Sequence, residues 1–378
     1  MSSTARTPLA GLKVVELARI LAGPWAGQTL ADLGAEVIKV ESPDGDDTRK
    51  WGPPFVDNGD GTADAAYFHC ANRGKMARAI DFSSPAGKTE VIELIRDADV
   101  LIENFKVGTL ARYGLDHASL AAINPRLIYC SITGFGQTGP YAGRAGYDFV
   151  IQGMSGIMDL TGMPDAPPQK IGVAYADIMT GLYAVIAIQA ALIQRATTGT
   201  GQHIDMALLD VMVGTLANQG LNYLASGISP SRLGNAHPNI APYEAFPCAD
   251  GWVILAVGND RQFARLVDAL ALDERPEWQN NPGRVADRAA LSAAITTKLD
   301  RWKRDELLAM MDELGVPAGP INRVEDAFAD PQVIHREMRL ALDREDAAAI
   351  PGIRTPIRFS DASLSCDRPA PRLPRARS

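Results

Sequence analysis

The sequence predicts an α/β fold with a parallel sheet covered by helices on both faces, together with a smaller α+β domain. Short apolar runs alternate with helical patterns through the first half of the chain. Hydrophobic residues make up 46% of the 378 residues, which is enough for a substantial core. The composition then shifts to scattered turn-forming residues at 226–242. We therefore expect two domains.

The N-terminal segment predicts a β-α-β unit. Residues 13–17 and 35–40 are apolar runs of strand length, and residues 23–33 between them have helical spacing. Parallel strands joined by a helix belong to a sheet that is covered on both faces. The turn after the first strand contains Gly23 and Gly27 but no GxGxxG, which argues against a dinucleotide-binding oxidoreductase. That turn still lies at the carboxyl edge of the sheet, where ligands bind.

The alternation of strands and helices continues. Residues 42–64 are rich in Gly, Pro and Asp and predict a long loop. A strand at 77–81 is followed by a helix that Ser84 caps and Pro85 begins. Further elements are predicted as strands at 100–103, 127–131 and 203–207, a helix after residue 107, and an apolar helix that ends at about residue 224.

Asp177 stands at the head of an apolar run, residues 178–192, that contains no Asp, Glu, Lys, Arg or His. One interpretation is a helix N-cap, whose carboxylate accepts hydrogen bonds from the first backbone N–H groups. The other is a carboxylate nucleophile or base at the rim of a cleft, where the same N–H groups would bind an anion. Asp148 is a second acid in a mostly apolar context, and it follows the glycine-rich loop 133–146.

The second half of the chain predicts a smaller α+β domain. A hairpin at 243–257 turns at 249–251 and is followed by helices at 261–270, 286–302 and 304–314. We therefore divide the chain into a large domain at 1–225, a linker at 226–242, a small domain at 243–321, and a return to the large domain with a C-terminal tail at 322–378.

Composition limits the possible functions. The net charge of −8 argues against bulk binding of nucleic acid. The four cysteines lie far apart without metal-ligand spacing, so we expect neither a disulfide framework nor a metal site. No uninterrupted apolar stretch reaches about 18 residues, and the N-terminus lacks an apolar signal core. We therefore expect a cytoplasmic protein that is not embedded in a membrane.

The chain resembles the class III CoA-transferases, the family of formyl-CoA and carnitine CoA-transferases, over nearly its whole length. The matching stretches are, in order, GLKVVELARILAGPWAGQTLADLGAEVIKVE, ANRGK, ADVLIENFKVGTLARYGLD, NPRLIYCSITGFGQTGP, GYDFVIQGMSG, AYADIMTG, TGTGQHIDMALLD and LGNAHPN. The resemblance implies a large Rossmann-like domain built from both chain ends, with a smaller domain between them. It also implies a homodimer of interlocked, ring-like subunits.

The resemblance also assigns chemistry. The catalytic acid of the family matches Asp177, which would attack an acyl-CoA to form a mixed anhydride and then an aspartyl-CoA thioester. CoA would pass to a free carboxylic acid, so the partners are an acyl-CoA and that acid, and no permanently bound cofactor or metal is required. Asp148 and Tyr147 match residues near the nucleophile. The matching lid residues, expected to shield the anhydride from water, are Gly234, Asn235 and His237.

Further site residues follow from the resemblance and from charge. The positions that match the CoA-binding residues of the family are Ile20, Leu21, Ala22, Lys39, Ile80, Asn104, Phe105 and Arg112. Trp51 is either a loop anchor or a wall of the substrate site. The lid and the PYEAF segment are similar to those of members that use succinyl-CoA and a second dicarboxylic acid, such as glutarate or a malate-like acid. Candidates to bind the second carboxylate are Arg49, Arg73 and Arg144.

Two alternatives stay open from the sequence. The α-methylacyl-CoA racemases have the same fold, but they place His before the Asp of the GYDFV motif, where this chain has Tyr147. Racemisation needs two acid-base groups, and an ordinary tyrosine, with a pKa of about 10, is a poor one near neutral pH. The second alternative is a paralogue that binds CoA without turnover.

Overall fold

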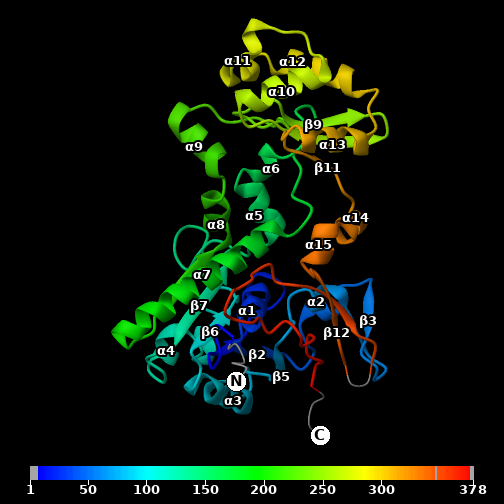
Figure 1. The fold of residues 1–378 in the computed structure, drawn as a ribbon. Coiled ribbons are helices and arrows are strands. Elements are labelled where there is room, and N and C mark those ends of the chain that lie inside the picture. The colour runs from blue at the N-terminus through cyan, green and yellow to red at the C-terminus, as the bar shows by residue number, and fades with distance from the viewer. Residues whose placement is uncertain (1–6, 345–346, 375–378) are drawn as a thin grey trace. The chain divides into compact units, whose positions relative to one another are not determined.

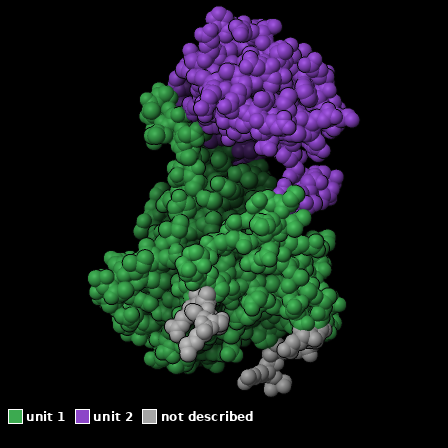
Figure 2. Space-filling view, in the orientation of Figure 1, with its two compact units in different colours: residues 1–157, 170–227, 331–378 green, residues 158–169, 228–330 purple. Residues whose placement is uncertain are grey.

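The computed structural model describes residues 7–344 and 347–374, and the chain divides into two compact units (Figure 2). Unit 1 contains the described residues up to 157, residues 170–227 and the described residues from 331 onward. Unit 2 contains residues 158–169 and 228–330. The second unit is thus longer than the predicted 243–321, because it also takes in the predicted linker and a short segment that precedes Asp177.

A six-stranded sheet forms the centre of unit 1 (Figure 1). All its neighbouring strands are parallel, in the order β5-β2-β1-β6-β7-β8. Counted within this sheet, the order is 3-2-1-4-5-6, the arrangement of doubly wound nucleotide-binding folds. The strands are β1 (Lys13–Glu16), β2 (Glu36–Glu41), β5 (Met76–Ala79), β6 (Val100–Glu103), β7 (Ile128–Thr133) and β8 (His203–Ala207). The predicted parallel sheet is therefore confirmed.

Helices cover both faces of the sheet. Helices α1 (Ala22–Asp32) and α7 (Tyr175–Thr198) pack on one another and share a core with alternate residues of the strands, among them Ile102. Helices α3 (Pro85–Arg96) and α4 (His117–Ala121) share the other core, which contains Leu101. Adjacent strand residues thus face opposite cores, as expected for a sheet buried on both sides.

Helix α7 is long and apolar enough to cross a membrane by length and composition alone. Its buried side chains, including Ala184 and Ile188, instead belong to the core of unit 1. At Gly181 the helix approaches the first residue of α1, and a Cβ there would lie only 2.7 Å from the Ala22 carbonyl oxygen. This close packing places the first turn of α7 beside the turn that joins β1 to α1.

The predicted loop at 42–64 is partly structured, so that prediction was wrong in part. It contains the 3₁₀ helix η1 (Asp47–Lys50) and the hairpin of β3 (Phe55–Asp57) and β4 (Ala63–Ala65). Arg49 anchors the segment, because its guanidinium binds Glu41 at 2.7 Å and Asp64 at 2.8 Å. The regular structure of this segment therefore depends on ion pairs rather than on apolar periodicity. For this reason the sequence pattern did not predict it.

The remaining elements of the first 227 residues are short. The predicted helix to about residue 224 is divided in two, α8 (Leu208–Gly214) and α9 (Ala217–Ser226), by residues 215–216. The Ser84 cap is confirmed by a 3.0 Å bond from the Gly87 N–H to its hydroxyl. The other short elements are α2 (Ala66–His69), η2 (Leu110–Tyr113), α5 (Asp148–Met154) and α6 (Ile157–Leu160).

Unit 2 contains an antiparallel sheet in the order β11-β10-β9, with its own helical cover. The predicted hairpin is confirmed as β9 (Tyr243–Cys248) and β10 (Gly251–Ala256), and β11 (Ala318–Pro320) completes the sheet. Its helices are α10 (Asp260–Leu270), η3 (Pro276–Trp278), α11 (Asn281–Ala286), α12 (Arg288–Leu299), α13 (Arg304–Glu313) and α14 (Val324–Ala329). The chain then returns to unit 1 with α15 (Pro331–His335), β12 (Arg339–Leu342) and β13 (Ile350–Ile353).

Candidate active site

A pocket of about 340 Å³ lies in unit 1 at the carboxyl edge of the parallel sheet. Its walls include the turn after β1 at residues 19–22, the turn after β6 at residues 104–107, and the end of the glycine-rich loop at 144–148. Strands β1 and β6 are the neighbours at which the strand order reverses direction. The pocket therefore occupies the crevice where doubly wound sheets bind their ligands.

Asp177 lines this pocket as the third residue of α7. The residue at the N-cap position is Ala174, so the interpretation of Asp177 as an N-cap was wrong. The side chain of Asp148, from α5, takes that role instead: its Oδ1 accepts the N–H of Ala176 at 2.8 Å and that of Asp177 at 3.4 Å. These N–H groups are therefore not free to bind an anion, because a carboxylate distant in sequence already occupies them.

Gln152 fixes the carboxylate of Asp148. One turn further along α5, its side-chain amide donates to Asp148 Oδ2 at 2.8 Å. Its carbonyl oxygen accepts the N–H of Ile171 at 2.9 Å, and the whole side chain is buried. Both oxygens of Asp148 are thus hydrogen-bonded, so this residue positions the start of α7 and holds a negative charge beside Asp177.

The environment of Asp177 changes its acidity. Burial, and then the negative charge of Asp148, raise the pKa of Asp177 to about 7. Within the described residues its carboxylate has no hydrogen-bond or ion-pair partner. Near neutral pH a large fraction of Asp177 is therefore ionised, and this carboxylate is poorly solvated. An ionised but poorly solvated carboxylate is suited to act as an oxygen nucleophile.

Three cationic side chains line the same pocket, and they suit an anionic ligand. Arg19 follows β1 and pairs with Asp47 at 3.1 Å, in a contact that is half exposed on both sides. Lys106 follows β6 and is exposed. The guanidinium of Arg144 lies 4.6 Å from the ring centre of Tyr141. Arg19 was not among the predicted site residues, although its place after a strand end could have indicated it.

The predicted CoA-binding residues divide into two groups. Those that line the pocket are Ile20, Leu21, Ala22, Asn104 and Phe105. Lys39 does not, because its fully buried ammonium binds Glu16 at 3.1 Å and Asp46 at 2.9 Å, which contradicts a direct contact with a phosphate. Ile80 is buried in the core, and Arg112 is exposed outside the pocket lining.

The three arginines predicted to bind the second carboxylate of the substrate also differ in where they lie. Arg49 is buried in the ion pairs with Glu41 and Asp64, and Arg73 is buried against Asp32 at 2.5 Å. Both guanidinium groups are committed to partners inside the protein, which contradicts a substrate role for them in this structure. Of the three candidates, Arg144 alone lines the pocket.

Tyr67 is a residue that sequence analysis missed. Burial, and then the charge of Asp177, raise its pKa to about 12, so its hydroxyl stays protonated and remains a hydrogen-bond donor. The ring of Trp51 packs edge-on against it, with 5.3 Å between ring centres. Trp51 is 47% exposed and lies outside the pocket lining, so this contact favours its interpretation as a loop anchor.

The predicted lid residues form a compact turn in unit 2. Gly234 has a φ of 61° and donates its N–H to the Gly162 carbonyl at 3.0 Å. His237 accepts the Asn239 N–H at its Nδ1, at 3.1 Å, and its ring packs against Tyr243. Asn235 is exposed. The histidine thus supports the loop internally, and the lid role of the three residues stays a prediction.

Comparisons with known proteins point to one family. The model of CoA-transferase family III matches residues 9–376. A succinate–glutarate CoA-transferase of Agrobacterium fabrum is 58% identical over 97% of this chain and 93% of its own length. The human succinyl-CoA:glutarate CoA-transferase is 41% identical over 97% of this chain and 83% of its own length. The crystal structure of a CAIB/BAIF family protein from Brucella suis is 62% identical, with a TM-score of 0.89 over 98% and 97% of the two chains.

Replacement of Asp177 by Asn should stabilise the protein at alkaline pH. The pKa of Asp177 is about 7 in the folded protein, above its ordinary value of 3.8. The folded state therefore loses stability as the pH rises from about 3.8 to about 7, because the carboxyl must ionise in a site that disfavours the charge. Asn cannot ionise, so the variant does not lose this stability. The gain in unfolding free energy should be larger near pH 8 than near pH 5, by roughly 1–3 kcal/mol. Urea unfolding at the two pH values measures it.

Asp44→Asn is the matched control, because Asp44 is an exposed acid of the same unit. This control should give the same small change at both pH values. An equal effect of Asp177→Asn at both values would contradict the raised pKa.

Proposed function

Because the chain belongs to CoA-transferase family III, we propose that it transfers CoA from succinyl-CoA to a free dicarboxylic acid of the glutarate type. The chain is an enzyme of this family, and two relatives named for succinate or succinyl-CoA and glutarate span nearly all of it. The observation that carries the chemistry is the unpaired Asp177 carboxylate in a pocket with three cationic side chains.

The first step is nucleophilic attack by Asp177. A carboxylate oxygen bonds to the thioester carbonyl carbon of the acyl-CoA, and the carbon–sulfur bond breaks. The products are a mixed anhydride between Asp177 and the acyl group, and the thiolate of CoA. The raised pKa supports this role, because a partly buried anion gains more from bond formation than a fully solvated one does.

The remaining steps restore the enzyme. The thiolate attacks the aspartyl carbonyl of the anhydride, which releases the donor acid and leaves an aspartyl-CoA thioester. The acceptor carboxylate attacks this thioester, which forms a second anhydride and again frees the thiolate. Attack of the thiolate on the acceptor acyl carbon then gives the new acyl-CoA and the free Asp177 carboxylate. One thioester is present before and after the cycle, so the exchange requires no external energy source.

The pocket is less suited to the racemase reaction. Of the residues described as lining it, none is a histidine. Both oxygens of Asp148 are already hydrogen-bonded, and Tyr147 is a 64% exposed tyrosine. A second acid-base group opposite Asp177 is therefore missing from this lining. A paralogue without turnover would bind CoA but fail the transfer assay below.

We also propose a homodimer of interlocked subunits that works in the cytoplasm, as the family resemblance implies. Unit 1 exposes large apolar side chains on its helices, including Phe149, Ile186, Ile193 and Leu224. Exposed apolar groups of this size are typical of surfaces that a partner covers. The exposure of such residues on α5, α7 and α9 supports a second copy there.

Asp177→Ala should abolish transfer and leave CoA binding in place. The substitution removes the nucleophile but none of the side chains that hold the turns after β1 and β6. We expect a fall in the rate of glutaryl-CoA formation by at least about a thousandfold, and CoA affinity within about threefold of the unchanged protein by calorimetry. Asp44→Ala is the control and should retain full turnover. Substantial transfer by the Asp177 variant would exclude the proposed mechanism.

Arg144→Met should weaken the use of dicarboxylic acids. A charged hydrogen bond to the second carboxylate would be lost, so KM for glutarate should rise by about tenfold to a hundredfold, while kcat and KM for succinyl-CoA change much less. Arg301→Met is the control, because Arg301 is an exposed arginine of unit 2. An increase confined to KM for succinyl-CoA would instead assign Arg144 to CoA.

A further inference from the structure

The turn between β1 and α1 has a strained backbone at a pocket wall. Ile20 has a φ of 71°, in the left-handed region that β-branched residues rarely adopt. Its neighbours in the pocket wall are Leu21 and Ala22, the first residues of the α1 region. Such strain persists only where surrounding contacts impose it.

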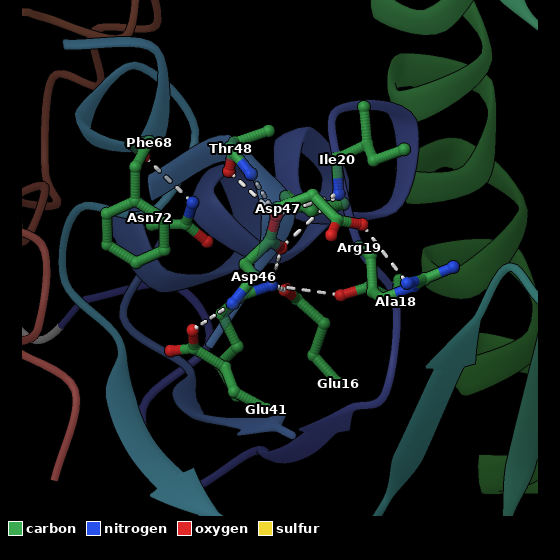
Figure 3. Close-up of polar contacts among 12 residues, drawn as sticks. Glu16, Ala18, Arg19, Ile20, Glu41, Asp46, Asp47, Thr48, Phe68 and Asn72 are labelled. Atoms are coloured by element: carbon green, nitrogen blue, oxygen red, sulfur yellow. Dashed lines mark hydrogen bonds and ion pairs between the residues drawn. The ribbon is translucent and has the colours of Figure 1, made fainter. Parts of the chain in front are cut away.

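Side chains from three separate segments hold the backbone of this turn. Lys39, on β2, donates to the Ala18 carbonyl at 2.9 Å. Asn104, after β6, accepts the Arg19 N–H at 2.9 Å and donates to the Arg19 carbonyl at 2.7 Å. The carboxylate of Asp46 accepts the Ile20 N–H between its two oxygens, at 3.3 and 3.4 Å (Figure 3). The contact from Asp46 is the one made to the strained residue itself.

Asp46 is itself fixed and buried. Only 2% of it is exposed. Its carboxylate accepts hydrogen bonds from the Thr48 hydroxyl at 2.7 Å and from the Thr48 N–H at 3.0 Å, and its own N–H donates to Glu41 (Figure 3). The ammonium of Lys39 lies 2.9 Å from its carboxylate. A carboxylate held by these groups before any ligand arrives provides a rigid acceptor for the Ile20 N–H.

A buried ion pair is weak support for a role in stability, because well-packed apolar side chains often stabilise a fold equally well. What apolar side chains could not supply here is an acceptor aimed at one backbone N–H. The polar cluster therefore directs the turn, and the turn forms a wall of the pocket.

We propose that Asp46 is a positioning residue for the CoA site. Its carboxylate, whose charge Lys39 neutralises, accepts the Ile20 N–H and so holds the backbone at 18–21 in a conformation that is left-handed at Ile20. This conformation presents Ile20, Leu21 and Ala22 to the ligand. Asp46 is not in the pocket lining and acts only through the turn. The inference rests on the proposed function, since it takes CoA as the ligand.

A double-mutant cycle tests the inference, with free CoA as the calorimetric probe of the full chain. Asp46→Ala should weaken CoA binding by about tenfold, the factor that corresponds to the cost of one left-handed residue. Glycine adopts that conformation without strain, so in an Ile20→Gly background the same substitution should change affinity by less than about threefold. In turnover assays Asp46→Ala should raise KM for succinyl-CoA and leave kcat within about twofold, because Asp177 is untouched.

Two further variants keep the outcome decisive. Asp44→Ala removes an exposed acid of the same loop and should leave CoA affinity unchanged. If Asp46→Ala does not fold, Asp46→Asn replaces it in the cycle, since Asn keeps the volume but accepts the Ile20 N–H only as a weaker, neutral acceptor. The loss of affinity should then be smaller than for Ala, and it should again shrink in the Ile20→Gly background.

The results separate this inference from the proposed function. Equal losses of affinity in the unsubstituted and in the Ile20→Gly background would overturn the inference, because Asp46 would then not act through this residue. Unchanged CoA affinity in a folded Asp46→Ala protein would also overturn it. Failure of the unsubstituted protein to bind CoA would overturn the proposed function, and the inference with it.

Discussion

The capping of α7 by Asp148 is the interaction on which the candidate site depends. An acid at a helix start normally satisfies the free N–H groups of its own first turn. Here Asp148, supplied by α5 and held by Gln152, already accepts them. Asp177 is left next to a negative charge and without a hydrogen-bond partner of its own among the described residues. The cap that orders the helix therefore also adds, after burial, to the causes that raise the pKa of Asp177.

The fold brings this carboxylate to a pocket through close helix packing and buried charge. The strand order places the turns after β1 and β6 side by side, and Gly181 lets α7 lie against the start of α1. At Gly27 a Cβ would lie 1.8 Å from a carboxylate oxygen of Glu16, so the absence of a side chain there leaves room for the buried acid. Glu16 in turn pairs with Lys39 and with Lys75, at 3.1 and 2.8 Å. The glycines after β1 thus serve packing rather than dinucleotide binding.

Sequence patterns predicted the parts of this molecule that depend on local periodicity. The strands of the parallel sheet, the hairpin at Tyr243–Cys248 and Gly251–Ala256, and the Ser84 cap all follow from spacing within a few residues. Asp177 was predicted as a nucleophile from its isolation in an apolar run and from the family resemblance, and the structure places it in the pocket.

The errors concern charges whose partners are distant in sequence. Lys39 and Arg73 were predicted to contact the substrate, but Glu16 and Asp46 bind the first and Asp32 binds the second. A basic residue after a strand has the same local pattern whether it faces a pocket or an internal acid. Only the three-dimensional arrangement distinguishes Arg144, which lines the pocket, from these buried cations.

The most direct test of a covalent role for Asp177 is the mass of the protein itself. The chain would be incubated with succinyl-CoA and no acceptor, quenched in acid, digested, and analysed for peptides that carry CoA. We expect CoA bound through a thioester to the peptide that contains Asp177, and its conversion to glutaryl-CoA when glutarate is added before the quench. Transfer of CoA to glutarate without any adduct on that peptide, or with an adduct on another residue, would contradict this role.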